Sequence, residues 1–146
     1  MSEEQMENAI RSFLKATVNK DVQKALSFLS ENVVWTAPQG TFKGSAEVRR
    51  YLNWMSQVTI NPKVTEIGIG IMVQGNTGVI EHELSGFSDG MKWEIPAMCV
   101  YVFSGDKIQN IRSFYDRLYQ VKQVAKGIIA KRAVNSVISA AEKGLH

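Results

Sequence analysis

Three side chains in the second half of the chain can move a proton or hold a polar atom during a reaction: His82, Ser113 and Tyr115. An imidazole changes charge near neutral pH, so it can act as a general base or acid. A serine or tyrosine hydroxyl can hold a carbonyl or enol oxygen while charge develops on it. Together these residue types predict acid/base chemistry on an oxygenated molecule, provided that the fold brings them to one place.

The elements that carry these residues are strands. From Val64 to Asp116 the sequence is rich in β-branched and aromatic residues and contains almost no helical periodicity. Short turn sequences divide this region at Gly75-Asn76, Asp89-Gly90 and Gly105-Asp106. Because short turns join antiparallel neighbours, we expect four consecutive antiparallel strands.

The turn at Asp89-Gly90 fixes which residues share a face of the sheet. A two-residue turn pairs Ser88 with Met91, which places His82 opposite Ala97. The face that carries His82 is otherwise apolar, with Ile80, Leu84, Ile95, Ala97 and Cys99. Glu81 and Glu83 flank His82 in sequence, but successive side chains of a strand point to opposite faces. Glu81-His82-Glu83 is therefore not expected to bind a metal.

The last hairpin allows two registers. A three-residue loop would pair Phe103 with Lys107, which places Ser113 and Tyr115 on the His82 face and Ile111 opposite Cys99. The match between apolar Ile111 and its apolar partner favours this register. We then expect His82 and Ser113 to flank Ala97, close enough to contact one ligand but too far apart for a direct Ser–His pair.

The alternative is a two-residue turn at Gly105-Asp106. A shift of one residue exchanges the two faces of a strand, so Arg112, Phe114 and Asp116 would then point inward. In either register no Gly-x-Ser-x-Gly sequence surrounds Ser113, so it is interpreted as a polar contact rather than a nucleophile. Cys99 is interpreted as a buried thiol on the same apolar face.

Helices precede and follow the strands. Apolar residues recur at helical spacing over residues 6–18, 22–29, 48–55 and 121–145, and a short strand is predicted at Val33–Thr36. Helices followed by an antiparallel sheet indicate an α+β fold, with the early helices packed on one curved face and a cavity between them. The residues expected to line that cavity are mainly aromatic or apolar: Trp35, Tyr51, Trp54, Leu84, Trp93, Ile95, Ala97, Cys99 and Ile111.

Composition limits the functional classes. The 146 residues suit one domain, and no apolar run is long enough to cross a membrane. A single cysteine and an acidic, polar N-terminus favour a cytoplasmic protein. The segment from Arg117 onward is basic, but no aromatic residue that could stack on bases follows Tyr119. We therefore expect neither nucleic acid nor a membrane as partner.

Two sequence patterns resemble the SnoaL-like, NTF2-like superfamily. One is Trp35-x-x-Pro38-x-Gly40-x-x-x-Gly44 before a helix, and the other is the closing strand from Asp106 to Asp116. The superfamily includes polyketide cyclases, ketosteroid isomerases, scytalone dehydratases and limonene-epoxide hydrolases. The resemblance covers about Met6 to Leu118 and implies a cystatin-like cone. We expect this domain to span residues 1–119, with 120–146 as a helical extension that lies outside the resemblance. The Arg-x-Asp of limonene-epoxide hydrolase would fall at His82 and Leu84 and its further Asp at Ser113, so this chain lacks that catalytic set.

These expectations combine into one functional prediction. We expect an isomerase, cyclase or dehydratase that needs no cofactor and acts on a small, largely apolar, oxygenated molecule, with His82, Tyr115 and Ser113 as its catalytic residues. The alternatives are a non-catalytic binding protein and an interaction module of the same fold. A homodimer is also expected, formed by the outer sheet face around Met98, Val100 and Val102 together with the apolar side of the C-terminal segment.

Overall fold

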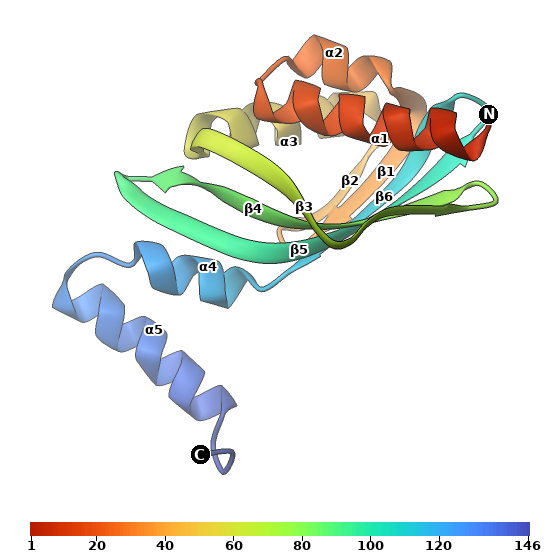
Figure 1. Ribbon diagram of the computed structural model, residues 1–146. Coiled ribbons are helices and arrows are strands. Elements are labelled where there is room, and N and C mark those ends of the chain that lie inside the picture. The colour runs from red at the N-terminus through yellow and green to blue at the C-terminus, as the bar shows by residue number, and fades with distance from the viewer.

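The computed structural model describes residues 1–146, which form a curved sheet, three helices that cover one of its faces, and two helices at the C-terminus (Figure 1). The elements follow one another as α1 (Glu3–Val18), α2 (Val22–Ser27), β1 (Leu29–Ala37), β2 (Gly40–Lys43), α3 (Gly44–Val58), β3 (Ile60–Gln74), β4 (Thr77–Ser88), β5 (Met91–Ser104), β6 (Lys107–Tyr115), α4 (Arg117–Val124) and α5 (Gly127–Ala141). The predicted α+β fold is confirmed.

The six strands are ordered β2-β1-β6-β5-β4-β3 in a single sheet. All neighbours are antiparallel except β1 and β6, which run parallel. The four consecutive strands expected from the turns are present as β3 to β6. The sequence did not indicate β2, which forms a short hairpin with β1 around Pro38-Gln39. The second helix was predicted to reach Leu29, but α2 ends at Ser27 and β1 begins at Leu29.

α1 and α3 pack on the sheet through the apolar faces that their periodicity predicted. α1 begins with a capping box in which Ser2 and Gln5 satisfy each other's backbone amides, and it buries Met6, Ile10 and Phe13. α3 buries Val48, Tyr51 and Leu52. Because these side chains pack on the concave face of the sheet, they set the distance between the helices and the strands.

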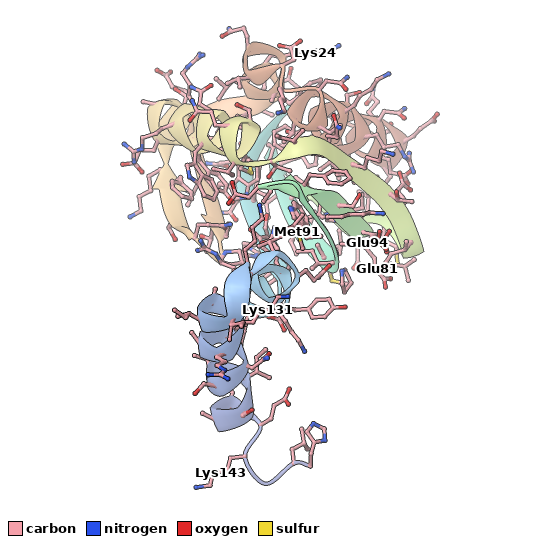
Figure 2. All side chains as sticks on the ribbon, turned by 90° about the vertical axis from the view of Figure 1, so that its left-hand side faces the viewer. Lys24, Glu81, Met91, Glu94, Lys131 and Lys143 are labelled. Carbon is pink, nitrogen blue, oxygen red and sulfur yellow. The ribbon has the colours of Figure 1, made fainter.

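The register of β4 and β5 agrees with the prediction from the Asp89-Gly90 turn. Ser88 pairs with Met91 and His82 pairs with Ala97. The His82 side chain therefore points to the helix-covered face, and Glu81 points to the other. In Figure 2, Glu81 lies on the opposite side of the sheet from Lys24 of α2.

The predicted register of β5 and β6 is wrong by two residues, although the predicted face is correct. The hairpin has a two-residue turn, with Ser104 paired to Lys107, and an irregularity after Ile108 leaves Gln109 unpaired. This extra residue reverses the exchange of faces that the two-residue turn would otherwise cause. Ser113 consequently lies opposite Cys99 rather than Ala97.

Tyr115 lies opposite Ala97 rather than Ile95, and Ser113 and Tyr115 share the His82 face. The alternative in which Arg112, Phe114 and Asp116 point inward is also wrong. Phe114 is 56% exposed, and Asp116 caps α4 by accepting a hydrogen bond from the Tyr119 amide at 2.9 Å. The structure thus has the two-residue turn of the second predicted register, but Ser113 and Tyr115 point inward as in the first.

The C-terminal segment has two parts that differ in their contacts. α4 packs along β5, whereas α5 buries no residue and extends away from the sheet (Figure 1). Lys131 of α5 and Lys143, which follows the helix, lie below the sheet and α1–α3 in Figure 2. None of the helices is both long enough and apolar enough to span a bilayer.

Candidate functional site

A cavity of about 310 Å³ lies between the concave face of the sheet, α1 and α3, and α4 lines part of it. This volume suits a small organic molecule. Ten of the twelve residues predicted for the site line this cavity: Trp35, Tyr51, Trp54, His82, Leu84, Trp93, Ile95, Cys99, Ser113 and Tyr115. The strands and helices therefore bring nearly the whole predicted set together.

The remaining two predicted residues, Ala97 and Ile111, do not line the cavity. Both are buried, Ala97 between His82 and Tyr115 in the sheet and Ile111 beside Trp35 of β1. The two-residue correction in register moves Ile111 from Cys99 to Tyr101. Trp54 lines the cavity but is 39% exposed, so it belongs to the rim.

His82 is the only imidazole that lines the cavity. Its side chain is 1% exposed and points from β4 into the cavity. The only hydrogen-bond contact of the ring joins Nδ1 to the Ile80 carbonyl oxygen, at 3.4 Å, which is a weak contact. Nε2 has no partner in the protein. Burial lowers the pKa of His82 below its ordinary value, so the neutral ring, which can accept a proton, predominates at neutral pH.

Ser113 is held by two hydrogen bonds on the part of the cavity wall that β6 forms. Its Oγ accepts from Trp35 Nε1 at 3.0 Å and from Cys99 Sγ at 3.3 Å. Burial raises the pKa of the Cys99 thiol, which therefore stays protonated. Since the Ser113 oxygen receives both bonds, its own proton remains available to a molecule in the cavity.

Gln39 joins Tyr51 and Tyr115 in a polar chain at one end of the cavity. Tyr51 donates to Gln39 Oε1 at 3.1 Å, and Gln39 Nε2 donates to the Tyr115 hydroxyl oxygen. Burial raises the pKa of both phenols, so both remain neutral donors. Tyr115 accepts from Gln39, and its proton has no acceptor in the protein.

Sequence reasoning missed Gln39 and the residues of α4. Gln39 lies in the turn between β1 and β2, where no periodicity indicates the direction of a side chain. Arg117, Gln120, Val121 and Val124 line the cavity from α4. One signal for α4 was available: Asp116 ends a strand and is a favoured N-cap residue, which predicts a helix that begins at Arg117.

α4 is attached to β5 through Gln123. Its side-chain amide accepts from the Glu94 backbone N–H at 2.9 Å and donates to the Glu94 carbonyl oxygen at 3.0 Å. β6 pairs with β5 only from Ala97 onward, so Glu94 lies on an edge that β6 leaves open. The Gln123 side chain takes the place of a neighbouring strand at this edge and fixes α4 beside the cavity.

The site contains no arrangement typical of a metal centre. No three His, Cys, Asp or Glu side chains of residues 1–146 lie together in positions suited to a metal ion. The groups present are one imidazole, hydroxyl donors and an apolar wall. Such a set can take up a proton from a bound molecule and hold a nearby oxygen.

The comparisons with known proteins agree with this architecture. The family model described as SnoaL-like domain matches residues 10–111, which is more than half of the chain. No curated protein sequence is significantly similar to this chain.

Several solved structures share the fold at low sequence identity. A predicted SnoaL-like polyketide cyclase from Jannaschia sp. CCS1 has a TM-score of 0.77 at 12% identity, and the match covers 86% of this chain and 95% of that one. An LEH-like epoxide hydrolase from M. tuberculosis has a TM-score of 0.72 at 17% identity, covering 90% and 97%. TerC, co-crystallised with polyporic acid, has a TM-score of 0.72 at 16% identity, covering 82% and 97%.

Proposed function

Since the chain belongs to the SnoaL-like domain family, we propose that its cavity binds a small, largely apolar, oxygenated molecule and that His82 transfers a proton to or from that molecule. The observation that carries this proposal is the state of His82. It is buried, it lines the cavity, and its Nε2 has no partner in the protein. Because Nε2 has no partner in the protein, a molecule bound in the cavity can supply one.

The proposed mechanism is general acid/base catalysis. Neutral His82 accepts a proton from a carbon or hydroxyl of the bound molecule. The free protons of Ser113 and Tyr115 hold the oxygen on which negative charge develops, and His82 then returns the proton at a second position. Isomerisation, dehydration and aldol-type cyclisation all follow this scheme.

Related structures support the binding part of the proposal. TerC, which shares the fold, was co-crystallised with polyporic acid, and the fold also occurs in an LEH-like epoxide hydrolase. The residues of this chain favour a different chemistry from epoxide hydrolysis. His82, Leu84 and Ser113 provide no carboxylate to activate water.

The experiment has two stages. Native mass spectrometry of gently purified protein identifies a bound compound, and its turnover is then measured with His82→Gln and with the control His146→Gln. His146 is the only other histidine and is exposed. We expect His82→Gln to lower turnover by about a hundredfold or more, the range of a lost general base, while His146→Gln has no effect. Unchanged turnover in His82→Gln contradicts the acid/base role and leaves a binding protein as the function.

We propose, as a second function, that the chain forms a homodimer. Exposed apolar side chains on the outer face of the sheet and on the tail support this proposal. Met72 and Phe114 are each 56% exposed on the sheet, and Ile128 and Ile129 are 71% and 86% exposed on α5. Surfaces of this kind are more typical of an interface than of a monomer. A second copy of this chain would cover both.

A further inference from the structure

The charged residues that line the cavity are all positive. Lys20, Lys63 and Arg117 belong to its walls, and no aspartate or glutamate does. The Lys20 ammonium is already held by the carbonyl oxygens of Ser56 and Thr59, at 2.7 and 2.9 Å. The side chains of Lys63 and Arg117 make no hydrogen bond or ion pair with the protein. The cavity therefore has positive charge that the protein itself does not neutralise.

Arg117 is the better placed of these two cations. It follows Tyr115 by two residues, and it is the first residue of α4, where the partial positive charge of a helix N-terminus adds to its own. Its charge acts on the phenols of both Tyr51 and Tyr115 and favours their ionised forms, although burial has the larger effect. Arg117 thus lies close to the polar end of the cavity.

The carboxylate nearest in sequence does not neutralise Arg117. Asp116 is not part of the cavity wall, and its Oδ1 accepts from the Tyr119 amide at 2.9 Å. That bond keeps the Asp116 side chain on the helix cap. The guanidinium of Arg117 consequently has five N–H donors and no anionic partner.

The hydroxyl groups at this end of the cavity are also unsatisfied as donors. Ser113 receives hydrogen bonds from Trp35 and Cys99, and Tyr115 receives one from Gln39. Each hydroxyl therefore has a proton left for a ligand. Together with Arg117 they form a set of donors that no acceptor of the protein balances, which matches an oxygen that carries negative charge.

We propose that the molecule bound in the cavity is an organic oxyanion, a carboxylate or phenolate, whose charged oxygen contacts Arg117 and Tyr115. Its apolar body lies against the aromatic wall formed by Trp35, Tyr51 and Trp93. This inference rests on the proposed binding function and names the class of ligand. Arg117 is exposed, so with a neutral molecule of the same shape its guanidinium stays hydrated and the ligand gains only the apolar contacts.

The test compares two probes that differ mainly in charge. Isothermal titration calorimetry measures the binding of 2-naphthoate and of 2-naphthamide to the full-length protein at pH 7.5. We expect the protein to bind 2-naphthoate about tenfold more tightly, which is the contribution of a hydrogen bond to a charged group, and we expect this preference to decrease as salt is added.

Variants of α4 assign the preference to one residue. Arg117→Gln should remove the preference for 2-naphthoate and leave 2-naphthamide binding within about twofold. Lys122→Gln removes the same charge from an exposed position of α4 that does not line the cavity, and it should bind as the unaltered protein does. Circular dichroism confirms that both variants retain their helices.

Each outcome supports or contradicts the oxyanion inference, and the outcomes separate its failure from a failure of the proposed binding function. Equal affinity for the two probes, or a preference that persists in Arg117→Gln, overturns the oxyanion inference and leaves the binding function intact. If neither probe binds, both this inference and the proposed binding function are contradicted. Preferential binding that Arg117→Gln abolishes and Lys122→Gln preserves supports both.

Discussion

At the scale of single residues, His82 determines how the protein responds to pH. An imidazole in an apolar cavity cannot be charged without loss of hydration, so burial lowers its pKa in the folded protein. The unfolded chain has no such restriction. Below the ordinary histidine pKa of about 6.5, the unfolded state therefore binds a proton that the folded state does not.

The sign of the effect on stability follows from this difference. The free energy of unfolding should fall as the pH drops from 7.5 to 5.5, and His82→Gln should show a smaller decrease over the same range. Urea denaturation of both proteins, with His146→Gln as control, measures the difference. An identical pH dependence in the unaltered protein and in His82→Gln would falsify the burial of His82 as the cause.

Residue-scale prediction succeeded where one residue type stood out from a regular pattern. His82 could be predicted because it interrupts a strand face that is otherwise apolar, and the Asp89-Gly90 turn fixes that face. Gln39 could not, because it lies in a turn where the direction of a side chain depends on tertiary contacts. Arg117 was counted only as part of a basic tail, since its place in the cavity depends on how α4 packs on β5.

At the scale of elements, the unpaired residue Gln109 determines which side chains of β6 enter the cavity. It lies between the turn and Ser113, and it restores the alternation that the two-residue turn shifts. Turn chemistry in a sequence indicates the length of a loop. It does not indicate a bulge, and for this reason the predicted pairing was wrong while the predicted face was correct.

Removal of Gln109 should therefore be far more damaging than its substitution. The deletion turns exposed Phe114 and Arg112 toward the core, which should cost more than about 4 kcal/mol of stability because a charge is buried without a partner. Gln109→Ala keeps the residue count and should change stability by less than about 0.5 kcal/mol. Urea denaturation measures both. A deletion variant as stable as Gln109→Ala contradicts this role of the bulge.

The attachment of α4 gives a second prediction for an element. The Glu94 amide is protected only by the Gln123 side chain, so Gln123→Ala should speed its hydrogen exchange roughly tenfold, the effect of about one hydrogen bond. Lys122→Ala alters the same helix without touching β5 and serves as control. If Glu94 exchanges at the same rate in both variants, Gln123 does not hold α4 on the sheet.

At the scale of the whole molecule, the exposed apolar surfaces predict self-association. Met98→Glu combined with Ile129→Glu places charge on both the sheet and α5. Both residues are exposed, so the fold should persist while the dimer dissociates. The control Asn135→Glu adds charge to a polar position of α5. Light scattering should give the mass of two chains for the unaltered protein and for the control, and of one chain for the double variant. A monomeric unaltered protein refutes the homodimer.

The whole-molecule fold was the most predictable level. Helical periodicity at the N-terminus, consecutive turns and alternating strands together indicated a helix-covered antiparallel sheet, and that architecture requires only the pattern of apolar residues. The parallel pairing of β1 with β6 was not predicted, because it joins segments far apart in the chain. The position of the cavity followed from the fold, whereas the identity of its ligand depends on the side chains at its polar end.

The most direct test of the central claim is the NMR signal of the His82 Cε1 group in protein labelled at its two histidines. We expect small aromatic molecules with a carbonyl, carboxylate or phenol group to shift the His82 resonance and to leave that of exposed His146 unchanged. We also expect His82 in the free protein to titrate below its ordinary pKa. A panel of such molecules that moves neither resonance, or moves only His146, would contradict a ligand-binding cavity at His82.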